Sequence, residues 1–346
     1  MDNPNLDRWL KKRKARLEGL SSDALFDQIL SGDMQALSAA ITLVESNNDE
    51  HSKEAQRLIQ QCLPHAGNAI RVGITGVPGV GKSSFIEAFG KVLTDCGKKV
   101  AVLAIDPSSS ISGGSILGDK TRMAQLVTNE NVFIRPSAAG ETLGGVARKT
   151  RESVMLCEAA GFDMILIETV GVGQSETVVK SMVDFFLLLM LSGAGDELQG
   201  IKKGIMEMAD ALVITKADGD NVRAANRASQ EYRNAMHLFP PNENEWIPQV
   251  FTCSAHEGTN VEKVFEVIQS FENQVKINGS FERNRRDQDK KWLRETLNEM
   301  LLRAFYNNDD LGKAFKEAED QMAKGEVTSF QAAEQLFELY RKHGDI

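Results

Sequence analysis

The chain has 346 residues, of which 42% are hydrophobic and 26% are charged, as in ordinary globular proteins. Its formal net charge of −9 argues against broad electrostatic attraction to nucleic acid or to an anionic membrane. The longest apolar run, residues 185–191, suits a buried strand and falls far short of the roughly 20 residues that a membrane-spanning helix needs.

The amino-terminal segment is polar and charged, and it has neither the apolar core of a signal peptide nor the lack of acidic residues of a transit peptide. The four cysteines, at positions 62, 96, 157 and 253, are scattered without paired spacing. That pattern is typical of reduced, mostly buried thiols. We therefore expect a cytoplasmic protein without a disulfide framework.

Residues 1–68 predict an N-terminal helical extension. Apolar residues recur at spacings of three and four within residues 23–30, 34–46 and 54–63, as in short amphipathic helices.

From residue 69 to residue 276, short apolar runs alternate with helical stretches. The alternation predicts an α/β domain with a doubly wound, mostly parallel sheet, whose strands are apolar because helices cover both faces. The expected strands are 71–75, 100–105, 132–135, 164–168, 185–191, 211–215 and 249–253.

Residues 277–346 predict a C-terminal helical extension that begins with a polar hinge over 277–290 and ends in a helix over 329–343. Between them, one helical face carries an apolar stripe. Such a stripe suits either packing against the preceding domain or dimerisation, and the sequence leaves both open. The stripe consists of Trp292, Leu293, Leu297, Leu301, Ala304 and Phe305.

Residues 73–84, GITGVPGVGKSS, contain the phosphate-loop pattern G-x-x-x-x-G-K-[ST] between a predicted strand and a predicted helix. Glycines let the backbone wrap round phosphate oxygens with its N–H groups pointing inward, and the start of the helix adds a favourable dipole. We expect Lys82 to reach the β- and γ-phosphates and the Ser83 hydroxyl to bind Mg²⁺. The loop comprises Gly76, Val77, Pro78, Gly79, Val80, Gly81, Lys82, Ser83 and Ser84.

Two later stretches indicate that the nucleotide is GTP. In residues 213–220, VITKADGD, the carboxylate of Asp218 can accept hydrogen bonds from guanine N1–H and the 2-amino group, and the stem of Lys216 would cover the base. Thr215 stands where this motif usually begins with Asn, a departure also known in signal-recognition-particle GTPases. In residues 252–258, TCSAHEG, we expect Ser254 and Ala255 near guanine O6.

The predicted strand at 164–168 leads into ETVGVGQSE, where GTPases carry Asp-x-x-Gly. We expect Glu168 to bind Mg²⁺ through water and the Gly171 N–H to meet the γ-phosphate. Gln174 is a candidate for orienting water, with a helix cap as the equal alternative.

Asp106 ends the second predicted strand, at the sheet edge where such folds bind ligands, and we assign it to Mg²⁺ or its waters. Asp119, further along the same serine-rich loop, is a candidate either for a metal-linked role or for a simple helix cap.

On these motifs, together with GAGDELQGIKKG at residues 193–204, the chain resembles the MeaB/ArgK family, whose human counterpart is the methylmalonic aciduria type A protein. The resemblance implies a homodimeric, Mg²⁺-dependent GTPase that gates adenosylcobalamin loading and protection of an acyl-CoA mutase, foremost methylmalonyl-CoA mutase. It also implies an extra switch loop at 193–204, which from the residues alone is either a mobile charged loop or an ordinary surface loop. The polar candidates in that loop are Asp196, Glu197, Gln199, Lys202 and Lys203.

Two other functions compete with this interpretation. A P-loop kinase of the ArgK type would need an acceptor site and often prefers ATP. A metal-inserting GTPase would need clustered Cys or His ligands, whereas the five histidines are dispersed and no Cys-x-x-Cys occurs.

Overall fold

The computed structural model describes residues 21–46, 48–105, 123–135, 143–169, 175–193, 203–239 and 242–343. The chain divides into two compact units, Met1–Gln288 and Asp289–Ile346. Each unit is described by itself below. The three-part division expected from the sequence stays a prediction.

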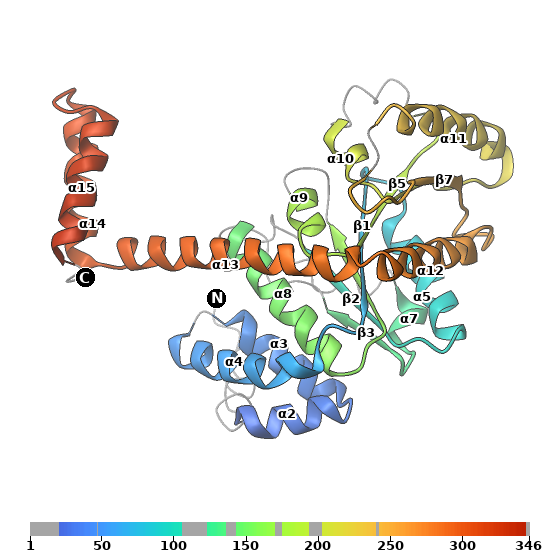
Figure 1. Cartoon of the computed structure of the whole chain (residues 1–346), viewed down its shortest axis with the longest axis horizontal. Coiled ribbons are helices and arrows are strands. Elements are labelled where there is room, and N and C mark those ends of the chain that lie inside the picture. Colours follow the sequence, from blue (N-terminus) through green and yellow to red (C-terminus); the bar gives the residue numbers. More distant parts are fainter. Residues whose placement is uncertain are drawn as a thin grey trace, which may run out of the picture. The chain divides into compact units, whose positions relative to one another are not determined.

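The first unit is built on a seven-stranded parallel sheet with the strand order β3-β2-β4-β1-β5-β6-β7 (Figure 1). In this register Gly73 of the central strand lies opposite Ile167 on one side and Phe186 on the other. The predicted α/β sheet and all its strands are thus confirmed, to within a residue or so at their ends. The strands are β1 (Ile70–Gly76), β2 (Val100–Ile105), β3 (Val132–Arg135), β4 (Met164–Thr169), β5 (Phe185–Met190), β6 (Ala211–Ile214) and β7 (Gln249–Thr252).

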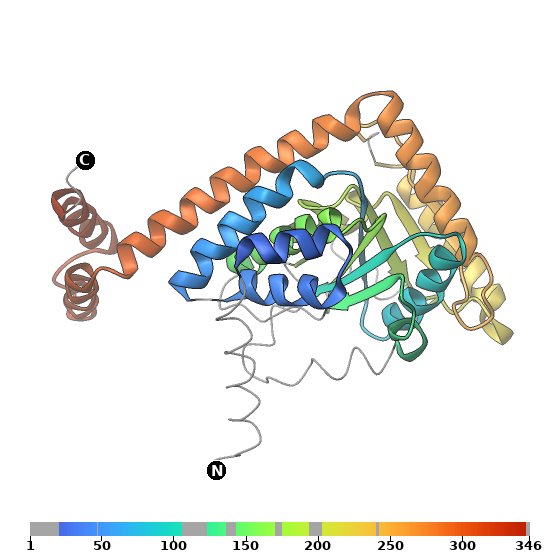
Figure 2. The ribbon, with the colours of Figure 1, turned by 90° about the horizontal axis from the view of Figure 1, so that it is seen from below.

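Helices cover both faces of the sheet, which explains why β2, β4 and β5 are buried along their whole length. The face covered by α5 and α12 holds an aromatic core, in which Phe85 stacks on Phe89 and the ring of Phe271 meets that of Phe185 edge-on. One face carries α5 (Lys82–Asp95), α7 (Ala124–Val127) and α12 (Val261–Ile277), and the other carries α8 (Leu143–Ala159) and α9 (Ser175–Lys180) (Figures 1 and 2). After β5 the chain forms α10 (Lys203–Glu207) before β6, and then η3 (Gly219–Asn221) and α11 (Val222–Met236) before β7.

The amino-terminal helices form a small bundle against α8, as Figure 2 shows in blue and green. Each begins at a polar cap, because the side chains of Ser21, Asp33 and Asn48 accept hydrogen bonds from backbone N–H groups of the first turn. The predicted helical character of this segment is confirmed for residues 22–62. The elements are α2 (Ser22–Leu30), α3 (Met34–Glu45), α4 (Asp49–Cys62) and the short η1 (Leu63–His65).

The polar hinge expected at residues 277–290 is wrong. Only Asn278 and Gly279, the latter at φ 71°, separate α12 from α13 (Ser280–Tyr306). The charged stretch is thus part of the helix α13. Arg, Glu, Lys and Gln are good helix formers, so a charged segment is no evidence of a break. The first turns of α13 also contact the segment that leads into β5: the Gln288 side chain donates to the Val183 carbonyl at 2.8 Å, and Arg285 forms an ion pair with Asp184.

The second unit contains the rest of α13, α14 (Asp309–Ala323) and α15 (Ser329–His343). Its small core consists of Ala318, Ala332 and Leu336, with Phe305 and Phe315 packed at the edge. The predicted final helix is confirmed. None of the described helices combines the length and the continuous hydrophobicity that a bilayer crossing requires.

Candidate functional site

The phosphate loop lies between β1 and α5, at the carboxyl edge of the sheet. Gly76 approaches the Leu189 carbonyl of β5 so closely that any side chain at this position would collide with it. The chain then turns, with the Val80 N–H donating to the Val77 carbonyl at 3.2 Å. Gly79 and Gly81 have φ values of 77° and 91°, which side chains disfavour. Glycine is therefore the residue that the backbone of this turn requires, whereas the role of the loop in binding phosphate stays a prediction.

Lys82 is the first residue of α5, and its ammonium donates to the Gly76 carbonyl at 2.9 Å. Burial lowers the pKa of Lys82, while the carboxylates of Glu168 and Glu176 oppose that shift. A half-buried cation at the start of a helix favours a ligand with several negative charges. This is the chemistry that a phosphate chain supplies.

Thr215 ties the phosphate loop to the end of β5. Its buried hydroxyl lies 2.7 Å from the Val80 carbonyl and 3.2 Å from the Met190 carbonyl. The Thr215 hydroxyl thus faces the backbone that shapes the loop. A threonine in place of the usual asparagine keeps a hydrogen-bond donor at this position.

The two predicted base-binding stretches meet, although they are far apart in the sequence. The Ser254 hydroxyl donates to Oδ2 of Asp218, and Oγ of Ser254 also accepts from the Glu257 N–H at 3.1 Å. Beside them, Lys216 is exposed in a left-handed conformation at φ 55°. The Ala217 N–H further joins the two stretches by donating to the Cys253 carbonyl. The fold therefore assembles the carboxylate and hydroxyl that the guanine prediction requires, with the half-buried Ala255 next to them.

Glu168 lies at the carboxyl end of β4, buried and close enough to Lys82 to affect its pKa. Next to it, the buried Thr169 hydroxyl donates to the Thr75 hydroxyl of β1 at 2.8 Å. The sequence reasoning missed Glu176, which is fully buried in the first turn of α9 and also acts on the Lys82 charge. The signal was available, since Glu176 ends the ETVGVGQSE stretch, but only the fold shows that it lies near Lys82.

Several predicted residues lie outside the described part of the chain: Asp106, Asp119, Gly171, Gln174, Asp196, Glu197, Gln199 and Lys202. Lys203 is described only as the first residue of α10. Within the described ranges, no group of three or more His, Cys, Asp or Glu side chains is arranged to hold a metal ion.

Comparison with known proteins identifies the family. Residues 37–310 match the family model described as "Methylmalonyl Co-A mutase-associated GTPase MeaB". The chain belongs to the MeaB family of GTPases. Its membership of this family supports GTPase activity.

Relatives of this MeaB-family chain match along most of their length. A Caulobacter vibrioides protein named "Putative GTPase" is 48% identical over 94% of this chain and 99% of its own. "GTPase ArgK" of Escherichia coli is 44% identical over 84% of this chain and 88% of its own. The mouse protein "Methylmalonic aciduria type A homolog, mitochondrial" is 42% identical over 95% of this chain and 83% of its own.

Among solved structures, "Crystal structure of LAO/AO transport system kinase" has a TM-score of 0.73 and 36% identity, and it covers 92% of this chain and 97% of that one. The fold described above is therefore shared with an experimentally determined structure over most of both chains.

Proposed function

We propose that this chain hydrolyses GTP to GDP and phosphate, and that its nucleotide state controls an adenosylcobalamin-dependent acyl-CoA mutase. The observation that carries the first part is the joint placement of Lys82 at the phosphate loop and of the Asp218–Ser254 pair beside it. The family description, which names methylmalonyl-CoA mutase, supports the second part.

Mg²⁺ fits the donor set that the described residues offer. Ser83 supplies a hydroxyl at the start of α5, and Glu168 supplies a buried carboxylate at the end of the neighbouring strand. Hard oxygen ligands of this kind, with phosphate oxygens, are the usual magnesium environment. Asp106 and Asp119 remain proposed contributors. When bound, Mg²⁺ neutralises phosphate charge.

The roles of the chain's own residues follow from their positions. The backbone N–H groups of the phosphate loop and the Lys82 ammonium would hold the phosphates. Asp218 would accept from guanine N1–H and the 2-amino group, while Ser254 orients its carboxylate. Gly171 would donate to the γ-phosphate and Gln174 would orient water. An extra nucleotide-dependent switch that a mutase contacts would be formed by Asp196, Glu197, Gln199, Lys202 and Lys203.

Lys82→Ala tests the active site. We expect this variant to lose GTP hydrolysis and to bind GDP more weakly, because the phosphate charge loses its partner. Lys91→Ala is the matched control, since Lys91 is an exposed lysine on the same helix. Turnover is measured with GTP and with ATP, alone and with a methylmalonyl-CoA mutase and adenosylcobalamin. Near wild-type turnover by Lys82→Ala would remove Lys82 from the site.

The same assay tests the mutase partner. Stimulation of GTP turnover by the mutase supports the proposed control, and Lys203→Ala should reduce that stimulation more than the unstimulated rate. If this mutase does not stimulate GTP turnover, it is not the partner, whereas the proposed GTP hydrolysis is unaffected.

A kinase remains the second candidate, because the solved relative is called a transport system kinase. The Asp218–Ser254 arrangement favours guanine, whereas adenine offers no donors at the corresponding position. Tighter binding of ATP than of GTP, with phosphate transfer to a protein acceptor, would favour the kinase.

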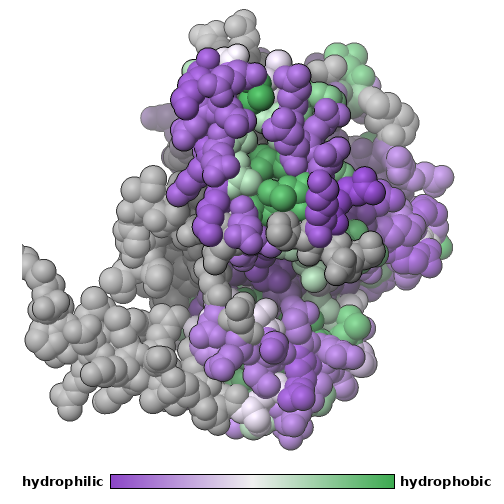
Figure 3. Space-filling model, turned by 90° about the vertical axis from the view of Figure 1, so that its left-hand side faces the viewer, coloured by the Kyte–Doolittle hydropathy of each residue, from purple (hydrophilic) through white to green (hydrophobic). Residues whose placement is uncertain are grey.

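We also propose that the chain forms a homodimer through its C-terminal helices. On α13, Leu293, Leu297 and Leu301 recur every four residues and are about half exposed or more. On α15, Phe330 and Phe337 are 70% and 60% exposed. Figure 3 shows a hydrophobic area framed by hydrophilic side chains on the face that α14 and α15 present. Exposed apolar clusters of this kind mark association surfaces.

The dimer proposal is tested by replacing Leu297 and Leu301 with lysine and measuring the mass by light scattering during size-exclusion chromatography. The wild-type chain should elute at twice the monomer mass and the variant at the monomer mass. A monomeric wild-type chain would contradict the proposal.

A further inference from the structure

A cavity opens at the amino edge of the sheet, at the opposite ends of the strands from the phosphate loop. Its volume is about 320 Å³, at the lower end of the range for small-ligand pockets. Asp184 directly precedes β5 and Asp210 directly precedes β6, so both carboxylates lie at the entry of a strand. The cavity is therefore separate from the nucleotide site.

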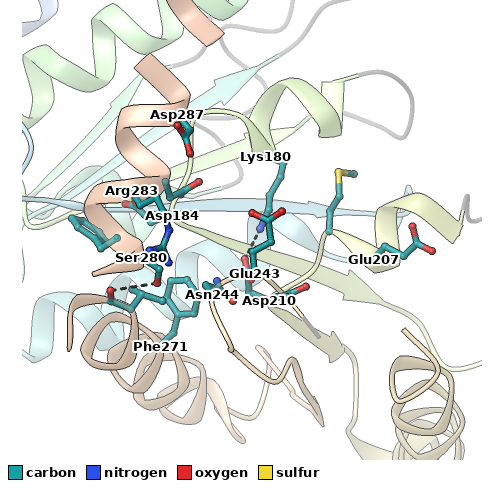
Figure 4. A pocket seen from close by; sticks show the side chains of 15 residues that line it. Lys180, Asp184, Glu207, Asp210, Glu243, Asn244, Phe271, Ser280, Arg283 and Asp287 are labelled. Atoms are coloured by element: carbon teal, nitrogen blue, oxygen red, sulfur yellow. Dashed lines mark hydrogen bonds and ion pairs between the residues drawn. The ribbon is translucent and has the colours of Figure 1, made fainter. Parts of the chain in front are cut away.

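The wall of this cavity is acidic. Five carboxylates line it, namely Asp184, Glu207, Asp210, Glu243 and Asp287. Two cationic side chains, Lys180 and Arg283, also line it. Figure 4 shows these charged groups distributed round the cavity rather than gathered at one point. Consistent with that spread, no group of three or more metal-ligating side chains occurs in the described residues. Arg285 pairs with Asp184 and Lys180 with Asp210, which leaves three further lining carboxylates against one further lining cation, Arg283. This balance favours a cation over an anion, and the spread of the charged groups suits an organic cation better than a metal ion.

Asp210 has an acceptor that the protein leaves unused. Its side chain is 1% exposed, and Oδ2 accepts from the Lys180 ammonium at 2.7 Å and from the Phe186 N–H at 2.8 Å. The other oxygen, Oδ1, is buried and has no hydrogen-bond partner among the described residues. A buried carboxylate oxygen without a donor costs free energy, and a ligand that donates to Asp210 from the cavity would offset that cost.

The surroundings of Asp210 make this a pre-arranged acceptor. The Asp210 N–H donates to the Phe186 carbonyl, and the Trp246 indole donates to the Asp210 carbonyl, so the backbone is held from both sides. Lys180, by contrast, is 33% exposed and approaches Asp210 from the rim. Its long, flexible side chain can swing outward and make room for another cation.

Beneath the Lys180–Asp210 pair, α12 supplies an apolar wall. Phe271 and Val275 are 1% and 2% exposed and line the same cavity, and Phe271 is labelled in Figure 4. An aromatic ring beside carboxylates suits a cationic head with a short hydrocarbon stem.

From these observations we infer that the cavity binds a small organic cation, an alkyl ammonium or guanidinium. Its head donates to Asp210 in place of Lys180 or beside it, Glu243 adds charge at the rim, and its stem packs on Phe271. The site is independent of the proposed GTPase reaction.

The test uses the full-length chain saturated with GDP and four probes of equal stem length. Ligand-observed NMR measures binding of n-pentylammonium, n-pentylguanidinium, 1-pentanol and hexanoate. The two cations should bind at least about tenfold more tightly than the neutral and anionic probes. Equal binding of all four, or no binding of the cations, would overturn the inference.

Variants assign the binding to Asp210. Asp210→Asn keeps the shape but removes the charge and should weaken cation binding about tenfold or more. Glu243→Gln at the exposed rim should weaken it about threefold, whereas the exposed Glu231→Gln on α11 should leave it unchanged. Cation binding that is the same in Asp210→Asn and Glu243→Gln as in the wild-type chain would refute the site.

Lys180→Met should strengthen cation binding, whereas the two preceding variants, Asp210→Asn and Glu243→Gln, should weaken it. Removing the resident ammonium leaves Asp210 without its cation, so n-pentylammonium should bind more tightly and should raise the melting temperature of this variant more than that of the wild-type chain. A purely structural role for Lys180 predicts no such rescue, and its absence in a folded variant would count against the site.

Discussion

Arg285 connects the beginning of α13 to the sheet, and its replacement should destabilise the first unit. The guanidinium donates to both carboxylate oxygens of Asp184, at 2.9 and 2.6 Å, and to the backbone carbonyls of Ala69 and Gly67 at 2.6 and 3.0 Å. Its Cζ atom also lies 4.4 Å from the centre of the Phe281 ring. We therefore expect Arg285→Met to lower the free energy of unfolding.

The magnitude follows from which charges lose their partner. The Asp184 side chain is 1% exposed, and among the described residues its cation is Arg285. In the variant Asp184 would keep one hydrogen bond, from the Arg71 N–H at 2.8 Å, but no cation. Glu158 would keep its two hydrogen bonds from Arg71, both at 2.9 Å. The variant therefore leaves one buried carboxylate without a cation, a change that costs about 3–5 kcal/mol. Burial opposes the Arg285 charge, but Asp184 and Glu158 outweigh it and raise the pKa of Arg285, so the guanidinium keeps its charge at neutral pH.

Urea unfolding of the full-length chain measures this loss, followed by the fluorescence of Trp246, which is buried in the first unit. Arg286→Met on the same helix is the matched control, because Arg286 is exposed, and it should change the stability by less than about 0.5 kcal/mol. Adding Asp184→Asn to Arg285→Met should recover part of the loss, since the stranded charge is gone. If Arg285→Met is as stable as Arg286→Met, the anchoring argument is wrong.

Three further predictions concern the nucleotide site and the thiols. Asp218→Asn should weaken GDP binding about 10²-fold or more, since two hydrogen bonds to a charged acceptor are lost. It should also shift the preference from GDP towards xanthosine diphosphate. If competition binding gives the same ratio of the two affinities in the variant and the wild-type chain, Asp218 does not contact the base. Thr215→Val removes the donor to the Val80 carbonyl and should lower the free energy of unfolding in urea by about 1–3 kcal/mol while weakening GDP binding several-fold. If neither quantity changes, the Thr215 hydroxyl does not support the phosphate loop. Only the exposed Cys96 should react with a maleimide at neutral pH, because burial raises the pKa of the other thiols, that of Cys62 to about 11 and that of Cys253 to about 12, and mass spectrometry showing a second labelled cysteine in the native chain would contradict this.

Much of the fold follows from local patterns. A run such as residues 185–190 is apolar at every position, as is typical of a short strand covered on both faces, and it is β5 in the structure. The loop between Gly76 and Lys82 is equally local, because glycine spacing and a following helix are enough to predict its turn. The prediction of a hinge at residues 277–290 was wrong because polar residues indicate exposure to solvent and do not indicate that the helix is interrupted.

The sequence by itself thus determined the class of sheet and the turn of the phosphate loop, because each depends on residues that are close together in the chain. Tertiary structure alone decided which distant groups meet. It brings Ser254 to Asp218, Glu176 towards Lys82 and Arg285 to Asp184, and it leaves one oxygen of Asp210 without a donor at the far edge of the sheet. Contacts of this kind depend on strand order and on how helices cross the sheet, and no local pattern of residues contains that information.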